Sequence, residues 1–260
     1  MKPTLPRRFV RTPAARQRGL TLIELSITMV LALFLLAGLL TILQNTRNAY
    51  ANENKLSQLQ DAERLALTIM TDVIQSAGYY PNPALFSADL SLPAVGSFPA
   101  AGSFQVLQGI TGTHSTSAPG DSVTVRFTTF PADGILDCIG ETNTGASNQT
   151  YVNIFKVVND QLACSVDGGT TFTGLVGGGG NFKVQNLDVS YGVRQGGVGN
   201  DNSINRYLHA DAMGAADWLA VGAVKIALTF TNPVPGPGGT PATIRLERVI
   251  AVMNRAGVTT

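Results

Sequence analysis

A short segment near the N-terminus combines residue types that could undergo covalent processing. Gly19 follows a basic stretch and precedes Leu20, and Glu24 stands four residues later at the start of an apolar run. Because glycine has no side chain, the backbone at Gly19 can adopt the extended form that a protease requires at a membrane surface. Cleavage after Gly19 would give Leu20 a free amine near Glu24. An ionised carboxylate in hydrocarbon is costly, so Glu24 is expected to need a partner.

The two cysteines of the chain, Cys138 and Cys164, are predicted to form a disulfide. Without a nearby group of histidines they would make a poor metal site. A disulfide that closes a loop of this length, about 26 residues, would contribute roughly 3–4 kcal/mol to stability in the chain-entropy model. The alternative is a pair of buried, unpaired thiols.

No catalytic, cofactor-binding or metal-binding residues are predicted. The four glycines at 177–180 are not followed by Lys-Ser/Thr, so they indicate a flexible turn rather than a phosphate loop. His114 and His209 are interpreted as surface residues, because no motif connects a serine or cysteine to either. Oxygen ligands at 200–203 and Asp211 could hold Ca²⁺, but the EF-hand spacing is absent and a solvated loop is favoured.

Glu24 must be positioned by a basic leader and a membrane-spanning helix. The leader, residues 1–19, holds six of the 18 Lys and Arg residues and no acidic residue, so the remainder carries a net charge of −5. Residues 20–43 are uncharged apart from Glu24 and would extend for roughly 36 Å as a helix, enough to cross a hydrocarbon core of about 30 Å. The positive charge predicts a cytoplasmic leader with the remainder outside. The acidic remainder argues against nucleic-acid binding.

Residues 44–77 are predicted to continue this helix as an amphipathic half. Neither proline nor glycine occurs between Leu39 and Ala77, so one helix of about 57 residues, roughly 85 Å long, is expected. Gly78 is the expected terminating residue. An apolar stripe, interrupted by Glu63, recurs at three- and four-residue steps and should be covered by a sheet; it consists of Leu56, Leu59, Ala66, Met70, Val73 and Ala77.

The remaining residues predict an irregular connection at 78–121 and a single β-rich head at 122–260. The fold class is α+β, with the long helix packed on a mainly antiparallel sheet. Alternating apolar residues indicate strands with one buried and one solvated face. The expected strands are 122–130, 151–158, 161–166, 182–194, 224–230 and 243–254, and the second and third form a hairpin across Asn159-Asp160.

The string Arg18-Gly19-Leu20-Thr21-Leu22-Ile23-Glu24-Leu25 resembles the class III signal peptide of type IV pilins and type II secretion pseudopilins. The resemblance implies a pilin-like fold, cleavage after Gly19 by a prepilin peptidase and N-methylation of Leu20. It also implies that Glu24 docks with the N-terminal amine of a neighbouring subunit. Thr41 stands where many major pilins have proline, which argues against a major pilin.

Further segments resemble the PilW family of minor pilins: residues 65–79, 186–193, 217–218 and 249–255. The resemblance implies a non-enzymatic subunit that waits in the inner membrane with a periplasmic head and is later incorporated into the pilus. The implied partners are other major and minor pilins, through the N-terminal helix, and a tip adhesin is a further candidate. A tip or initiation complex is the implied place of action.

Three other interpretations remain open from the sequence. A type II secretion pseudopilin would share the membrane end but serve a different machine. An ordinary signal-anchor helix with a stray glutamate would need no processing. A membrane-anchored periplasmic enzyme or binding module would require a convergent polar pocket, for which the sequence gives no sign.

Overall fold

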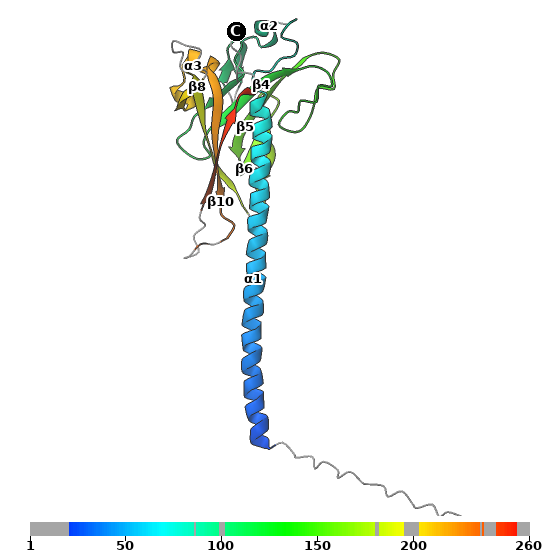
Figure 1. Cartoon of the computed structure of the whole chain (residues 1–260), viewed down its shortest axis with the longest axis vertical. Coiled ribbons are helices and arrows are strands. Elements are labelled where there is room, and N and C mark those ends of the chain that lie inside the picture. The colour runs from blue at the N-terminus through cyan, green and yellow to red at the C-terminus, as the bar shows by residue number, and fades with distance from the viewer. Residues whose placement is uncertain are drawn as a thin grey trace, which may run out of the picture. The chain divides into compact units, whose positions relative to one another are not determined.

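The computed structural model describes residues 21–85, 87–98, 102–179, 182–194, 203–234, 236 and 243–253 (Figure 1). The chain divides into two compact units, Met1–Ala51 and Asn52–Thr260. The predicted processing residues Gly19 and Leu20 lie outside the described residues, and so do 200–202 of the calcium candidate.

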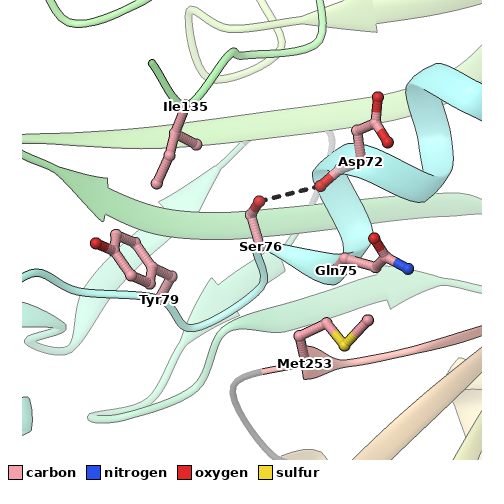
Figure 2. A pocket seen from close by; sticks show the side chains of 6 residues that line it. All are labelled: Asp72, Gln75, Ser76, Tyr79, Ile135 and Met253. Carbon is pink, nitrogen blue, oxygen red and sulfur yellow. Dashed lines mark hydrogen bonds between the residues drawn. The ribbon is translucent and has the colours of Figure 1, made fainter. Parts of the chain in front are cut away.

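The long helix α1 runs from Leu22 to Gln75 and contributes residues to both units. Its 54 residues confirm the prediction of one continuous helix. The chain leaves the helix at Gly78, whose positive φ of 74° favours glycine and whose N–H donates to the carbonyl of Arg126. Directly after the helix, the Ser76 hydroxyl donates to the carbonyl of Asp72 in its last turn (Figure 2).

The second unit contains two sheets and a separate hairpin, whereas the sequence analysis predicted one sheet. The first sheet has the order β3 (Ile110–Thr113), β4 (Ser122–Thr129), β5 (Gln149–Val158), β6 (Gln161–Ser165) and β7 (Thr173–Gly177). The second has the order β11 (Thr243–Ala251), β10 (Val221–Thr231), β8 (Val184–Arg194) and β9 (Ile204–Leu208). The hairpin pairs β1 (Val95–Phe98) with β2 (Gly102–Phe104).

All pairs between these strands are antiparallel, as predicted. The expected hairpin is confirmed as β5–β6, where Asn159 and Asp160 both have positive φ, as a two-residue turn of this kind requires. The strands β7 and β9 were not predicted, because both are short and lack a run of alternating apolar residues. Short helices complete the unit: α2 (Ala88–Ser91), η1 (Ala210–Ala212) and α3 (Ala215–Leu219).

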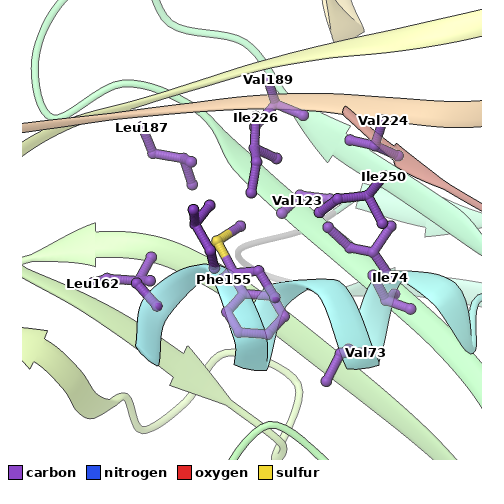
Figure 3. Close-up of a cluster of buried hydrophobic side chains, with 14 of the residues drawn as sticks. Val73, Ile74, Val123, Phe155, Leu162, Leu187, Val189, Val224, Ile226 and Ile250 are labelled. Carbon is purple, nitrogen blue, oxygen red and sulfur yellow. The ribbon is translucent and has the colours of Figure 1, made fainter. Parts of the chain in front are cut away.

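The core of the second unit lies between the C-terminal part of α1 and both sheets (Figure 3). Val73 and Ile74 of the helix belong to one buried cluster with Phe155 of the first sheet and Ile226 of the second. Most of the predicted stripe is buried, and Leu56 at its start is half-buried. The stripe also includes residues that were not predicted, Leu67 and Ile74.

Residues 78–121 contain α2, β1, β2 and β3, and are therefore more regular than the predicted connection. They also cover one face of β4, whose eight residues are all buried. Arg126 at the centre of β4 is fully buried and donates hydrogen bonds to the carbonyls of Leu92, Pro93, Gln105 and Gln108. Burial lowers the pKa of Arg126 to about 10. The prediction of a solvated second face is therefore wrong for β4, because the connection packs over it.

Candidate functional site

Thr21 and Glu24 form a reciprocal cap at the first turn of α1. The Glu24 Oε2 atom accepts hydrogen bonds from the backbone N–H and the hydroxyl of Thr21, both at 3.1 Å. The N–H of Glu24 in turn donates to the Thr21 hydroxyl oxygen at 3.4 Å. This capping box satisfies backbone donors that a helix start leaves without intrahelical partners. The carboxylate is thus held at the positive end of the helix dipole.

The capping box was not predicted from the sequence, where Glu24 was interpreted as an unpaired anion. The signal was present, since a threonine followed three residues later by glutamate before an apolar run is typical of a helix start. Within the described residues, Glu24 therefore has a partner in its own chain. Any contact with a neighbouring amine must compete with Thr21 or add to it.

The helix after Glu24 is long and apolar enough to cross a membrane. Every residue from 21 to 51 is exposed, including Phe34 with 78% of its surface accessible. Four hydroxyl groups of its described residues, those of Ser26, Thr28, Thr41 and Thr46, donate to carbonyls of the preceding turn. Because these hydroxyls bond to the helix itself, they can lie in a hydrocarbon surrounding. The chain is therefore that of a membrane-anchored protein, as the pilin-like sequence motif also indicates.

The predicted disulfide is present between Cys138 and Cys164, whose Cα atoms are 6.3 Å apart. Both residues are almost fully buried and belong to the core cluster. Cys164 lies on β6, and Cys138 lies in the loop that leads from β4 to β5. The N–H of Cys138 donates to the side chain of Asn153 on β5, so the loop is attached to the sheet by two different bonds.

The end of α1 borders a hollow of about 490 Å³ (Figure 2). Its lining combines the apolar Ile135 and Met253 with the polar side chains of Asp72, Gln75 and Ser76. Among the described residues, the lining contains no histidine, cysteine or lysine, and the Ser76 hydroxyl donates to a carbonyl rather than to a base. The described part of the lining therefore offers no nucleophile paired with a general base.

The structure brings together three residues that no sequence motif connects: His114, Asp121 and His209. The Nδ1 atom of His114 lies 2.8 Å from Oδ1 of Asp121, and the two imidazole rings lie 4.3 Å apart. The prediction that both histidines are plain surface residues is wrong for His114, whose side chain is only 16% exposed. No local pattern joins these positions, because loop closure and sheet pairing bring them together.

The weaker candidates are partly described. Gly177 and Gly178 have positive φ values of 97° and 74° at the end of β7, as the turn interpretation requires. Asp211 is exposed in η1, and its predicted calcium partners at 200–202 lie outside the described residues.

Comparisons with known proteins match two parts of the chain. The family profile described as Prokaryotic N-terminal methylation motif matches residues 14–40, and that described as Type IV Pilus-assembly protein W matches residues 144–247. Together these ranges cover about half of the chain. Among solved structures, a type IV-like pilin from Thermus thermophilus is similar over 77% of this chain and 98% of its own, with 18% identity and a TM-score of 0.47. No curated protein matches the chain significantly.

Proposed function

We propose that this chain, which belongs to the PilW family and is a minor pilin of type IV pilus assembly, acts in a tip or initiation complex of the pilus. The family indicates a structural subunit that interacts with other pilins. Beyond its place in the pilus, the chain undergoes a processing step and makes a contact that commits the subunit to assembly. Thr41, in place of the proline common in major pilins, supports a role outside the main shaft.

The processing step is cleavage after Gly19 by a prepilin peptidase, followed by N-methylation of Leu20. The matched methylation motif at 14–40 contains both residues and supports this assignment. The leader stays in the cytoplasm, because its six positive charges oppose translocation, while the helix spans the inner membrane. The Cys138–Cys164 disulfide supports a periplasmic head, since disulfides persist in oxidising compartments.

The assembly contact is an ion pair between Glu24 and the Leu20 amine of a neighbouring subunit. The observation that carries this proposal is the position of Glu24, whose carboxylate is held by Thr21 at the helix start beside the cleavage junction. The hydrogen bonds from Thr21 engage Oε2, and no hydrogen bond among the described residues engages the other oxygen, Oε1, which can accept from an ammonium group. Cleavage creates that ammonium group, so processing and assembly are coupled.

The experiment that tests processing is mass spectrometry of the N-terminal peptide from sheared pili and from membranes. Wild-type protein should begin with N-methyl-Leu20. Gly19→Leu should retain the leader and be absent from the pilus fraction, because the bulky side chain disturbs the backbone at the cut. Gly38→Leu is the matched control, since a Cβ at Gly38 has no atom of the described chain within 4 Å. It should be processed normally.

A wild-type peptide that begins before Leu20, or a mature-sized Gly19→Leu protein, would overturn the assigned cut. A normal N-methylated terminus on protein found only in membranes, with none in pili, would instead contradict the place of action. The two failures are therefore distinguishable.

A further inference from the structure

Three side chains from separate segments of the second unit converge beside Val189 of β8. His114 follows β3, Asp121 precedes β4, and His209 follows β9. Each offers a ligand atom, and the three atoms all lie within 4.8 Å of one another. We propose that His114, Asp121 and His209 form a binding site for a divalent transition-metal ion, with Zn²⁺ as the best match.

The carboxylate of Asp121 is the fixed part of this site. Only 2% of its side chain is exposed, and its Oδ2 atom accepts the N–H of Val189 on β8 at 2.7 Å. Its Oδ1 atom accepts the N–H of Ser115 at 2.8 Å and faces Nδ1 of His114. A carboxylate held by two backbone donors on different segments stays in place when a metal ion approaches, which lowers the cost of ordering the site.

His209 is oriented in the way that metal-binding histidines usually are. Its Nδ1 atom lies 3.1 Å from the carbonyl oxygen of Val189 and 3.6 Å from Oδ1 of Asp188. An acceptor at Nδ1 fixes the tautomer in which Nε2 carries a lone pair, and such backbone or carboxylate acceptors accompany most histidine ligands. We therefore assign Nε2 of His209 as its ligand atom.

His114 supplies the third ligand beside Asp121. The Nδ1–Oδ1 distance of 2.8 Å is that of a hydrogen bond in which a proton lies between the two atoms. A tetrahedral Zn²⁺ with bonds of about 2.0 Å would separate two ligand atoms by roughly 3.3 Å. A shift of about half an ångström therefore converts the hydrogen-bonded pair into two ligands, with the metal replacing the proton.

The ligand types select the class of metal. Two imidazoles and one carboxylate suit Zn²⁺, Co²⁺, Ni²⁺ and Cu²⁺, whereas Ca²⁺ and Mg²⁺ prefer a shell made of oxygen atoms. The side chain of His209 is 42% exposed, so an ion can enter from solvent and water can fill the fourth position. Bound metal would join the turn between β3 and β4 to the end of β9, and hence link the two sheets.

The test is a Co²⁺ titration of the full-length, tag-free protein in detergent, followed by visible absorption. The wild type should bind one Co²⁺ per chain with the intense ligand-field bands of a tetrahedral site, and Zn²⁺ should displace it while excess Mg²⁺ does not. His209→Gln and His114→Gln should each lose these bands and weaken binding by roughly 100-fold or more. Asp211→Asn is the matched control, because Asp211 is an exposed acid two residues from His209 and lies outside the group.

Thermal melts in a chelator show whether each variant is folded before metal is added. His209 is the decisive position, since its half-exposed side chain can be replaced with little effect on packing. The proposal is wrong if the wild type gives only the weak bands of octahedral Co²⁺. It is equally wrong if the bands survive in both histidine variants, or if Asp211→Asn abolishes them.

Discussion

The two halves of α1 share one backbone conformation but differ completely in their surroundings. In the first half, residues 22–51 are all exposed, whereas the second half buries a stripe that includes Leu59, Met70 and Ile74. Apart from Glu24, residues 22–43 carry no charge and are apolar on all sides of the helix, and hydroxyls such as that of Thr28 bond to carbonyls of the helix itself. The second half is apolar on one side only. The comparison teaches that this chain supplies the packing partners for one half, while the other half requires lipid or other subunits.

The largest expected effect comes from Glu24, the one charged residue between positions 22 and 43. Glu24→Gln keeps an oxygen that can accept from Thr21, so the helix cap remains, but it removes the charge. Loss of one partner from a buried ion pair costs about 3–5 kcal/mol. We therefore expect incorporation into pili to fall at least about tenfold, with normal cleavage and an unchanged melting temperature of the second unit. Quantitative immunoblots of pilus and membrane fractions measure this effect.

In the same experiment, Thr21→Val shows whether Glu24 acts through its helix cap or through its charge. The variant removes the hydroxyl that contacts Glu24 but leaves the carboxylate in place. It should be incorporated nearly as well as the wild type. If Glu24→Gln is also incorporated normally, Glu24 is only a helix cap and the contact between subunits must lie elsewhere.

The next largest effect is expected on the free energy of unfolding, for which one methionine in each half of α1 can be compared. Met70 is fully buried in the core, whereas Met29 has 65% of its surface exposed. Met70→Ala should reduce the free energy of unfolding by about 2–5 kcal/mol through lost packing and a cavity. Met29→Ala should leave it unchanged. Denaturant unfolding of the detergent-solubilised protein, followed by the fluorescence of Trp218, provides the measurement.

If Met70→Ala and Met29→Ala destabilised the protein equally, the second half of α1 would not be the only half that packs in the core. Equal destabilisation would mean that the first half packs against the sheets or that unfolding of the two units is coupled. A large effect of Met29→Ala on pilus incorporation alone would instead support packing of that half against other subunits.

Local features of this fold could be predicted from the sequence, and contacts between distant segments could not. The continuous helix and the β5–β6 hairpin follow from residues that are neighbours in sequence, such as Asn159 and Asp160 in the turn. The capping box of Thr21 and Glu24 was also visible locally, but the cost of a charge in the membrane received more weight. The disulfide could be predicted because the chain has only two cysteines.

The two sheets and the histidine cluster depend on pairings with large sequence separation. Asp121 and Val189 are 68 residues apart, and no pattern around either one indicates the bond between them. The buried face of β4 was missed for a similar reason. An arginine such as Arg126 normally indicates a solvated face, yet here its guanidinium group donates to four carbonyls, those of Leu92, Pro93, Gln105 and Gln108.

The smallest expected effect concerns Glu63, which interrupts the apolar stripe in the second half of α1. Burial raises the pKa of the Glu63 carboxyl, and its Oε1 atom has no hydrogen-bond partner among the described residues. The folded state therefore binds the proton more tightly than the unfolded state, so stability falls as the pH rises from the ordinary value through the raised one. Glu63→Gln should remove this slope and raise the melting temperature near neutral pH by no more than about 3 °C.

Melting curves across the acidic range test the prediction with Glu53→Gln, an exposed position on the same helix, as the control. If Glu63→Gln lowers the melting temperature at neutral pH, the charged carboxylate has a stabilising partner. Its burial within the apolar stripe would then not destabilise the folded state.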